Sequence, residues 1–341
     1  MKRYLAAFLI ILTISTSAYS QQHKKNGKQL IFAFDVIRHG YRSPIKNIPN
    51  MTEKSWDVSA TGTLTPLGAE GSQKVGRRLK SYYIDKLGFI DSNPSADSIY
   101  VASTEMERTI STANNTLSGM FGENASNITV DVLPATSELL KTPKTREGMT
   151  TMIFDTLDSK KKKEFDDMIT YLNDKFNLKM KAIEEIMAIG DLLSVNRIHN
   201  KSFPESELPK RKVNQLLNLR EYLYLYRNSV NKFMCEASKN LLVHAVQELN
   251  DKTQNKVPYK IEFYFAHDTH ILSTLSLLNK LPKSIPPYNS DLRFELYGSN
   301  DSNYYVKVLL NDRVIPVCGR NLCELKQFSN LVDENIKEKC S

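Results

Sequence analysis

The chain has 341 residues, of which 41% are hydrophobic and 25% charged, and it contains only 13 glycines and 13 prolines. This composition excludes a disordered, low-complexity or fibrous protein, and the length allows one large domain or two smaller ones. The net charge of +8 suits a nucleic acid, a membrane surface or a small anion as partner, and does not choose among them.

Residues 1–20 have the pattern of a secretory signal peptide. Lys2 and Arg3 form a basic start, the segment 5–14 is almost wholly apolar, and small residues lead up to a cleavage site after Ser20. Loss of these two basic residues would lower the net charge from +8 to +6. An N-terminal membrane anchor is the weaker alternative, because the apolar run is short for a bilayer span. We therefore expect an exported protein, periplasmic or extracellular, with no stable membrane insertion.

The four cysteines all lie in the expected mature chain, and export permits them to form disulfides. They allow three pairings, and the sequence alone does not select one. Cys318 and Cys323 are close enough to close a local loop, a pairing that leaves Cys235 with Cys340. A zinc site is the competing interpretation, but the chain has no paired C-x-x-C and no histidine near these cysteines.

Strand and helix patterns follow one another in the first part of the chain. Residues 30–37 are nearly all apolar, which is typical of a strand that is buried on both faces. Thr65 and Pro66 form a favourable start for the next helix. A short strand is expected at 98–103, and the amphipathic helix after it carries Arg108 in its first turn.

The middle of the chain has helical periodicity only. Residues 151–255 are therefore predicted to form an α-helical insertion or lid. Its lysine run at 160–163 suits an anionic surface or, more often, a solvated helix face. Strand patterns return at 259–266, before another helix, and again at 292–297 and 304–310.

These elements predict an α/β fold with a mixed central sheet and helices on both faces. Two distant segments, residues 30–150 and 256–335, would build this core, and the helical insertion would lie between them.

Polar residues follow three of the predicted strands at the points where the strands end. In an open α/β sheet, ligands bind beyond the carboxyl ends of the strands, so these side chains are expected to converge. Three guanidinium groups suit a small anion that accepts paired hydrogen bonds, and phosphate is the obvious candidate. The carboxylates are too few for a metal site. The residues are Arg38, His39, Tyr41 and Arg42 after the first strand, Arg108 after the second, and His267 and Asp268 after the third.

The same residues resemble the histidine acid phosphatases, the branch 2 family of the histidine phosphatase superfamily that includes the prostatic and lysosomal acid phosphatases. Segment 38–44 matches the signature R-H-G-x-R-x-P, and 267–269 matches the distant H-D motif. Segment 103–109 is similar to the family's second arginine motif. The resemblance spans residues 30–330 and is weak in the helical middle. It implies a phosphoglycerate mutase-like core and no cofactor.

The resemblance also implies a metal-independent acid phosphatase that hydrolyses phosphomonoesters through a phosphohistidine intermediate. His39 would be the nucleophile, and it must be neutral to attack phosphorus. Asp268 would protonate the leaving oxygen and then help water to attack. A cage of cations can replace a metal in phosphoryl transfer. The residues implied to hold the phosphate oxygens are Arg38, Arg42, Arg108 and His267.

Each of these residues also has a structural interpretation. His39 could be a buried structural histidine, Asp268 a helix N-cap, and Arg108 a residue of the helix surface. Tyr41 and His270 are candidate substrate contacts. Tyr41 stands where the family often has an acidic residue, and His270 could equally be solvated. Because a phosphomonoester carries its own proton below about pH 6, activity is expected to be greatest in acid.

Two other functions stay open. A phytase or sugar-phosphate phosphatase would use the same residues, although segment 267–270 reads H-D-T-H and lacks the Asn of the usual phytase motif. A basic exported protein that binds anionic polymers or membranes would explain the charge, but not the placement of His39 and Asp268. Nucleic acid is not expected, because the chain has no aromatic–basic recognition motif. The natural substrate and the oligomeric state, a homodimer included, stay open.

Overall fold

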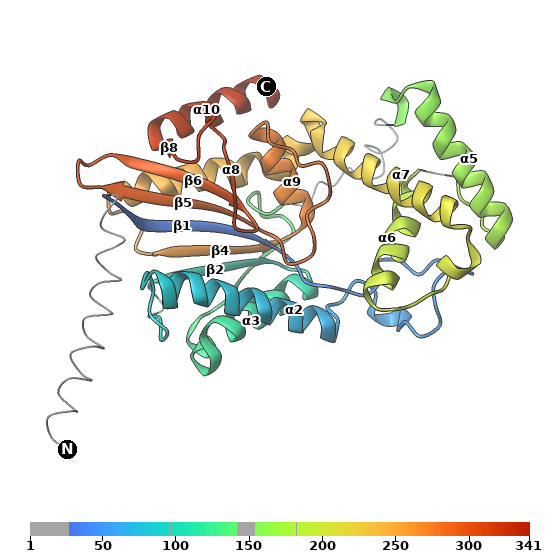
Figure 1. Cartoon of the computed structure of the whole chain (residues 1–341), viewed down its shortest axis with the longest axis horizontal. Helices are drawn as coiled ribbons and strands as arrows, with labels where there is room; N and C mark the ends of the chain where they lie inside the picture. Colours follow the sequence, from blue (N-terminus) through green and yellow to red (C-terminus); the bar gives the residue numbers. More distant parts are fainter. Residues whose placement is uncertain (1–26, 96, 142–153, 182) are drawn as a thin grey trace, which may run out of the picture.

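The structure is a computed structural model that describes residues 27–95, 97–141, 154–181 and 183–341. The expected signal peptide at 1–20 lies outside these residues. Figure 1 shows a central sheet with helices above and below it, and a separate group of helices beyond one end of the strands.

The strands and helices alternate in the order that the sequence patterns suggest. The strands are β1 (Lys28–Arg38), β2 (Ile99–Thr104), β3 (Asp131–Leu133), β4 (Ile261–Ala266), β5 (Asp291–Ser299), β6 (Tyr304–Leu310), β7 (Arg313–Ile315) and β8 (Cys323–Glu324). The helices are α2 (Pro66–Leu79), continued by the π-helical segment η2 (Lys80–Lys86), then α3 (Glu107–Phe121), α5 (Ser159–Phe176), α6 (Glu184–Ile198), α7 (Lys210–Ser229), α8 (Asn231–Thr253), α9 (Asp268–Leu277) and α10 (Leu325–Lys339).

The sheet is mixed, and its strand order is β3-β2-β4-β1-β5-β6-β7, with β8 paired to β6. Strands β1 and β2 both run parallel to β4, whereas β5 is antiparallel to β1. The register pairs Arg38 with Ala266 and Ser103 with Phe265, so the carboxyl ends of β1, β2 and β4 lie at one edge. The predicted α/β fold with a mixed sheet is confirmed.

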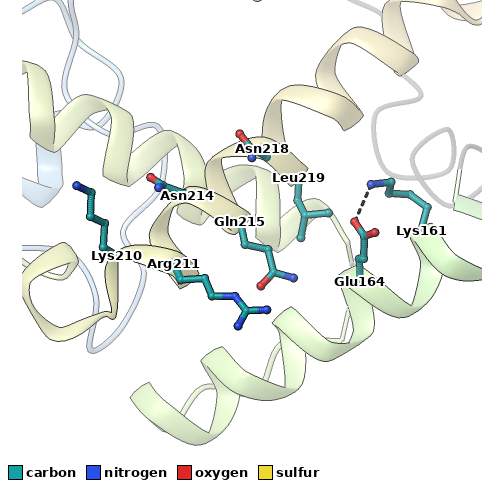
Figure 2. A pocket seen from close by; sticks show the side chains of 8 residues that line it. All are labelled: Lys161, Glu164, Lys210, Arg211, Asn214, Gln215, Asn218 and Leu219. Carbon is teal, nitrogen blue, oxygen red and sulfur yellow. Dashed lines mark hydrogen bonds and ion pairs between the residues drawn. The ribbon is translucent and has the colours of Figure 1, made fainter.

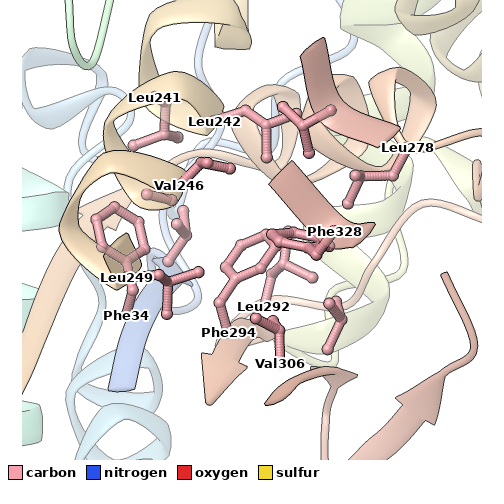
Figure 3. Close-up of a cluster of buried hydrophobic side chains, with 14 of the residues drawn as sticks. Phe34, Leu241, Leu242, Val246, Leu249, Leu278, Leu292, Phe294, Val306 and Phe328 are labelled. Carbon is pink, nitrogen blue, oxygen red and sulfur yellow. The ribbon is translucent and has the colours of Figure 1, made fainter. Parts of the chain in front are cut away.

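Each face of the sheet has its own apolar core, as expected for alternating side chains on buried strands. Helices α8, α9 and α10 cover one face, and α2 and α3 cover the other (Figure 1). Figure 3 shows the first of these cores, which includes Phe34, Leu242, Leu249, Phe294 and Phe328.

Helices α5, α6 and α7 build a third apolar cluster, which also includes the first turns of α8 and, from the loop after β1, Ile48 and Met51. The rest of α8 packs on the sheet, through Leu242 and Leu249 among others. The division into 30–150, 151–255 and 256–335 stays a prediction. The packing of α8 favours an insertion that ends near the α7–α8 junction.

Both disulfides join the expected cysteines, Cys318 with Cys323 and Cys235 with Cys340. The second bond ties α10 to α8. Helix α10 and the short strands β3, β7 and β8 were absent from the sequence prediction. No helix within the described residues is long and apolar enough to cross a membrane.

Helix α2 begins as predicted, since the Thr65 side chain accepts a hydrogen bond from the Gly68 N–H and Pro66 is the first helical residue. Helix α3 differs in detail from the amphipathic helix that the sequence predicts. Its buried face includes Thr109, Thr112 and Thr116 beside the apolar residues, so part of this face is available for hydrogen bonds.

Candidate active site

The carboxyl edge of the sheet brings the predicted residues together. Arg38 is the last residue of β1, and His267 follows β4 directly. The ring centroids of His39 and His267 are 5.4 Å apart. The Arg38 guanidinium lies 2.6 Å from the carboxylate of Asp268. Two segments more than 200 positions apart in sequence therefore form one site.

His39 is buried, with 3% of its surface exposed, and its Nδ1 lies 2.9 Å from the Gly40 carbonyl oxygen. Because a carbonyl only accepts hydrogen bonds, Nδ1 carries the proton and Nε2 keeps its lone pair. Burial first, and then the positive charges of Arg108, His267 and the two arginines beside it, hold the pKa of His39 well below its usual range. The ring is neutral and has one basic nitrogen.

The Gly40 backbone packs closely against both α2 and α3. Its N–H donates to Thr112 Oγ1 at 2.9 Å. A Cβ at this position would approach Ser72 Oγ to 2.7 Å and the Gly68 carbonyl oxygen to 2.8 Å. Only glycine fits this close approach, which fixes the neighbouring His39.

Arg38 is held on three sides. It donates to the Pro286 carbonyl oxygen at 2.5 Å, forms the ion pair with Asp268, and lies over the Tyr288 ring at 4.0 Å from its centroid. It is 3% exposed. A guanidinium with this many partners has a fixed direction.

Asp268 is the first residue of α9, and the N-cap is His267, without a side-chain cap bond. The structural alternative for Asp268, a helix N-cap, is therefore wrong. Its carboxylate accepts from the Tyr224 hydroxyl at 2.7 Å and faces Arg38 instead. Burial alone would raise the pKa of Asp268, but Arg38, His39 and the Tyr224 hydrogen bond together hold that pKa well below its usual range. The carboxylate is ionised in the free site.

Arg42 pairs with Asp191 on helix α6. The two terminal nitrogens of Arg42 donate to the two carboxylate oxygens at 3.0 and 2.9 Å, and Nη1 also donates to the Ser43 carbonyl oxygen at 3.1 Å. Burial opposes the charge of Arg42, yet Asp191 raises the pKa of Arg42 above its usual range. Arg220 on α7 approaches the same carboxylate to 3.6 Å.

Arg108 and His267 complete the predicted set. Arg108 is half-buried and donates to the Gly62 carbonyl oxygen at 3.3 Å, while its charge acts on His39. His267 Nε2 lies 3.3 Å from Thr104 Oγ1. Both side chains belong to the His39 environment, so Arg108 is more than a residue of the helix surface.

The two candidate substrate contacts differ in position. Tyr41 is half-buried, and its ring meets the Tyr288 ring edge to face, with centroids 5.4 Å apart. His270 has no exposed surface, and its ring centroid is 5.7 Å from that of His267. The alternative of a solvated His270 is therefore wrong.

No group of three or more metal-ligating side chains occurs in the part of the chain that the structure describes. A separate pocket of about 750 Å³ lies between α5 and α7. Figure 2 shows Lys161 and Glu164 on one side of it and polar residues of α7 on the other. None of the site residues above lines it.

Sequence reasoning missed the residues that the insertion and the loop before β5 contribute: Asp191, Arg220, Tyr224 and Tyr288. A signal existed for Asp191, because it is a single charge within the apolar run 189–193. Arg220 and Tyr224 have the i, i+4 spacing of one helix face. Neither pattern shows which part of the protein these side chains contact.

Comparison with known proteins assigns this architecture to a family. The chain belongs to the histidine phosphatase superfamily (branch 2), which matches residues 29–311. The expected family is confirmed.

The similar proteins carry two kinds of name. The chain is 25% identical to the prostatic acid phosphatase of Homo sapiens over 344 residues, which cover 92% of this chain and 87% of the relative. It is 26% identical to the lysosomal acid phosphatase of Rattus norvegicus over 342 residues, which cover 91% and 78%. The solved apo phytase of Hafnia alvei has the same fold, with a TM-score of 0.69 at 16% identity, over 92% of this chain and 98% of that one.

Proposed function

We propose that this chain is an acid phosphatase that hydrolyses phosphomonoesters through a phosphohistidine on His39. The observation that carries the proposal is the state of His39, a neutral ring with its free nitrogen among buried arginines. The names of the sequence relatives support the same reaction class.

In the first step, Nε2 of His39 attacks the phosphorus. A P–N bond forms while the bond from phosphorus to the ester oxygen breaks. The residues that hold the non-bridging oxygens are Arg38, Arg42, Arg108 and His267. Because the cage is preformed, its donors need no reorganisation as the phosphoryl group moves.

Asp268 handles the proton of the leaving group. Its low pKa leaves it ionised, so it cannot bring a proton of its own. Below about pH 6 the substrate monoanion carries that proton. Asp268 accepts it and passes it to the leaving oxygen. In the second step Asp268 takes a proton from water, whose oxygen attacks phosphorus as the P–N bond breaks. Activity should therefore be greatest in acid.

Hydrolysis of para-nitrophenyl phosphate by the purified chain tests the proposal. We expect activity that survives EDTA and is lost in His39→Ala. Unchanged activity in His39→Ala would refute the nucleophile, and a pH profile that peaks above neutrality would refute the proton route. Asp268→Asn should lose more rate on esters with poor leaving groups than on good ones. Equal losses would leave Asp268 without a role as proton carrier.

Inositol polyphosphates are the second candidate substrates, because several solved proteins with this fold are phytases. Parallel assays with phytate and simple monoesters separate the two. A polymer-binding role has less support, since lysines 161 and 163 pair with Glu164 and Asp167.

Export and assembly are also proposals. We expect the chain to lose residues 1–20 on export, which the N-terminal sequence of the secreted protein would test. Light scattering of the purified chain would separate a homodimer from a monomer.

A further inference from the structure

Asp191 is a buried carboxylate that the insertion places against the site. It lies on α6, it is 5% exposed, and it accepts two hydrogen bonds from Arg42. Arg220 on α7 holds it from a second direction at 3.6 Å. The reaction outlined above gives this carboxylate no chemical step.

The Asp191 pair leaves one edge of the Arg42 guanidinium free. A guanidinium has five N–H donors in a rigid plane. Asp191 takes one from each terminal nitrogen, and the Ser43 carbonyl oxygen takes another from Nη1. Nε–H and the second hydrogen of Nη2 are left, and covalent geometry puts both on the same edge.

The Nε atoms of Arg42 and Arg38 are buried and have no hydrogen-bond partner among the residues that the structure describes. Both side chains are more than nine-tenths buried. A buried donor without a partner is unfavourable and calls for an explanation. Two such donors beside a neutral histidine are explained by an anion that accepts from them.

We propose that Asp191 is a positioning residue, which fixes Arg42 so that its Nε edge faces the phosphoryl group of the substrate. This inference rests on the proposed function. It means that the helical insertion, rather than the strand ends alone, sets the direction of a phosphate-binding donor. Arg220 supports the arrangement, since together with Arg42 it keeps the pKa of Asp191 low although burial opposes the charge.

A role for Asp191 as a competitor of phosphate predicts the opposite change in phosphate affinity. If Asp191 only competed with phosphate for Arg42, its neutralisation would tighten phosphate binding. If it orients Arg42, Asp191→Asn should weaken binding, because the Asn amide presents a donor to one of the two Arg42 donors and pushes the guanidinium away. A displaced charge-assisted hydrogen bond corresponds to about tenfold or more in affinity.

The test measures the inhibition constant of inorganic phosphate, with kcat and KM on para-nitrophenyl phosphate, in Asp191→Asn. We expect the inhibition constant and KM to rise about tenfold. Glu205→Gln is the control, because Glu205 accepts two hydrogen bonds from Arg197 in the same insertion but outside the site. It should leave both constants unchanged. An inhibition constant that is unchanged or lower in Asp191→Asn would overturn the inference.

A double-mutant cycle shows whether Asp191 acts through Arg42. On an Arg42→Met background, Asp191→Asn should change phosphate inhibition less than twofold, whereas equal effects on both backgrounds would overturn the inference. Asp191→Glu serves if Asp191→Asn does not fold. The extra methylene moves the guanidinium, so weaker phosphate binding is expected, and wild-type binding would overturn the inference. Absence of hydrolysis by the unsubstituted chain would refute the proposed function itself.

Discussion

Thr112 offers a sharp test of how His39, the proposed nucleophile, is held in place. Its buried hydroxyl accepts from the Gly40 N–H at 2.9 Å and donates to the Arg108 carbonyl oxygen at 2.6 Å. Thr112→Val keeps the shape but leaves a buried N–H without a partner, which costs about 1–3 kcal/mol. If that energy falls on the placement of His39, kcat/KM should drop by roughly 5- to 150-fold.

Thr116→Val is the matched control. Thr116 lies one turn further along α3, is equally buried, and its hydroxyl has no hydrogen-bond partner within the described residues. We expect its kcat/KM to equal that of the wild type. Steady-state rates on para-nitrophenyl phosphate and urea unfolding measure both effects. Equal kcat/KM for the two variants would refute the claim that the Gly40 hydrogen bond positions His39.

Two further predictions concern stability. The Cys235–Cys340 disulfide closes a sequence separation of 105 and Cys318–Cys323 one of 5. In the chain-entropy description their removal lowers the free energy of unfolding by about 5 and about 2 kcal/mol, and equal losses in urea would contradict it. The lowered pKa of His39 means that only the unfolded chain binds this proton below about pH 6.5. The free energy of unfolding should therefore decrease as the pH is lowered, by up to about 1.4 kcal/mol per pH unit. The His39→Gln variant should lack this contribution to the pH dependence. An identical slope in the variant would refute the assignment of a neutral His39.

The sequence predicted the sheet and the strand-end residues well, because both depend on local patterns. The apolar run at 30–37 favoured a strand covered on both faces, and the polar residues directly after it were therefore expected at the carboxyl edge. Parallel pairing with β4 then brought His267 and Asp268 beside His39. The site follows from topology as soon as these strands are neighbours.

The partners of those residues could not be predicted in the same way. Asp191 and Tyr224 lie on insertion helices whose docking depends on long-range packing, and helical periodicity gives no information about docking. The short strands β7 and β8 have too few residues for a pattern. Thr112 was missed because a threonine on a helix face is unremarkable until its hydrogen-bond partner is known.

The arrangement separates two tasks within the site. In the proposed mechanism the strand ends supply the reacting nitrogen and most of the phosphate donors. Helices α6 and α7 supply the Asp191 carboxylate, which binds Arg42, and the Tyr224 hydroxyl, which binds Asp268. A rotated guanidinium loses paired hydrogen bonds without losing its charge, and those paired bonds add geometric specificity as well as energy. Changes in α6 and α7 that move Asp191 or Tyr224 should thus alter phosphate binding and proton transfer while the nucleophile stays in place. The insertion is therefore the part of this fold where phosphate affinity and leaving-group preference can change while His39 keeps its position.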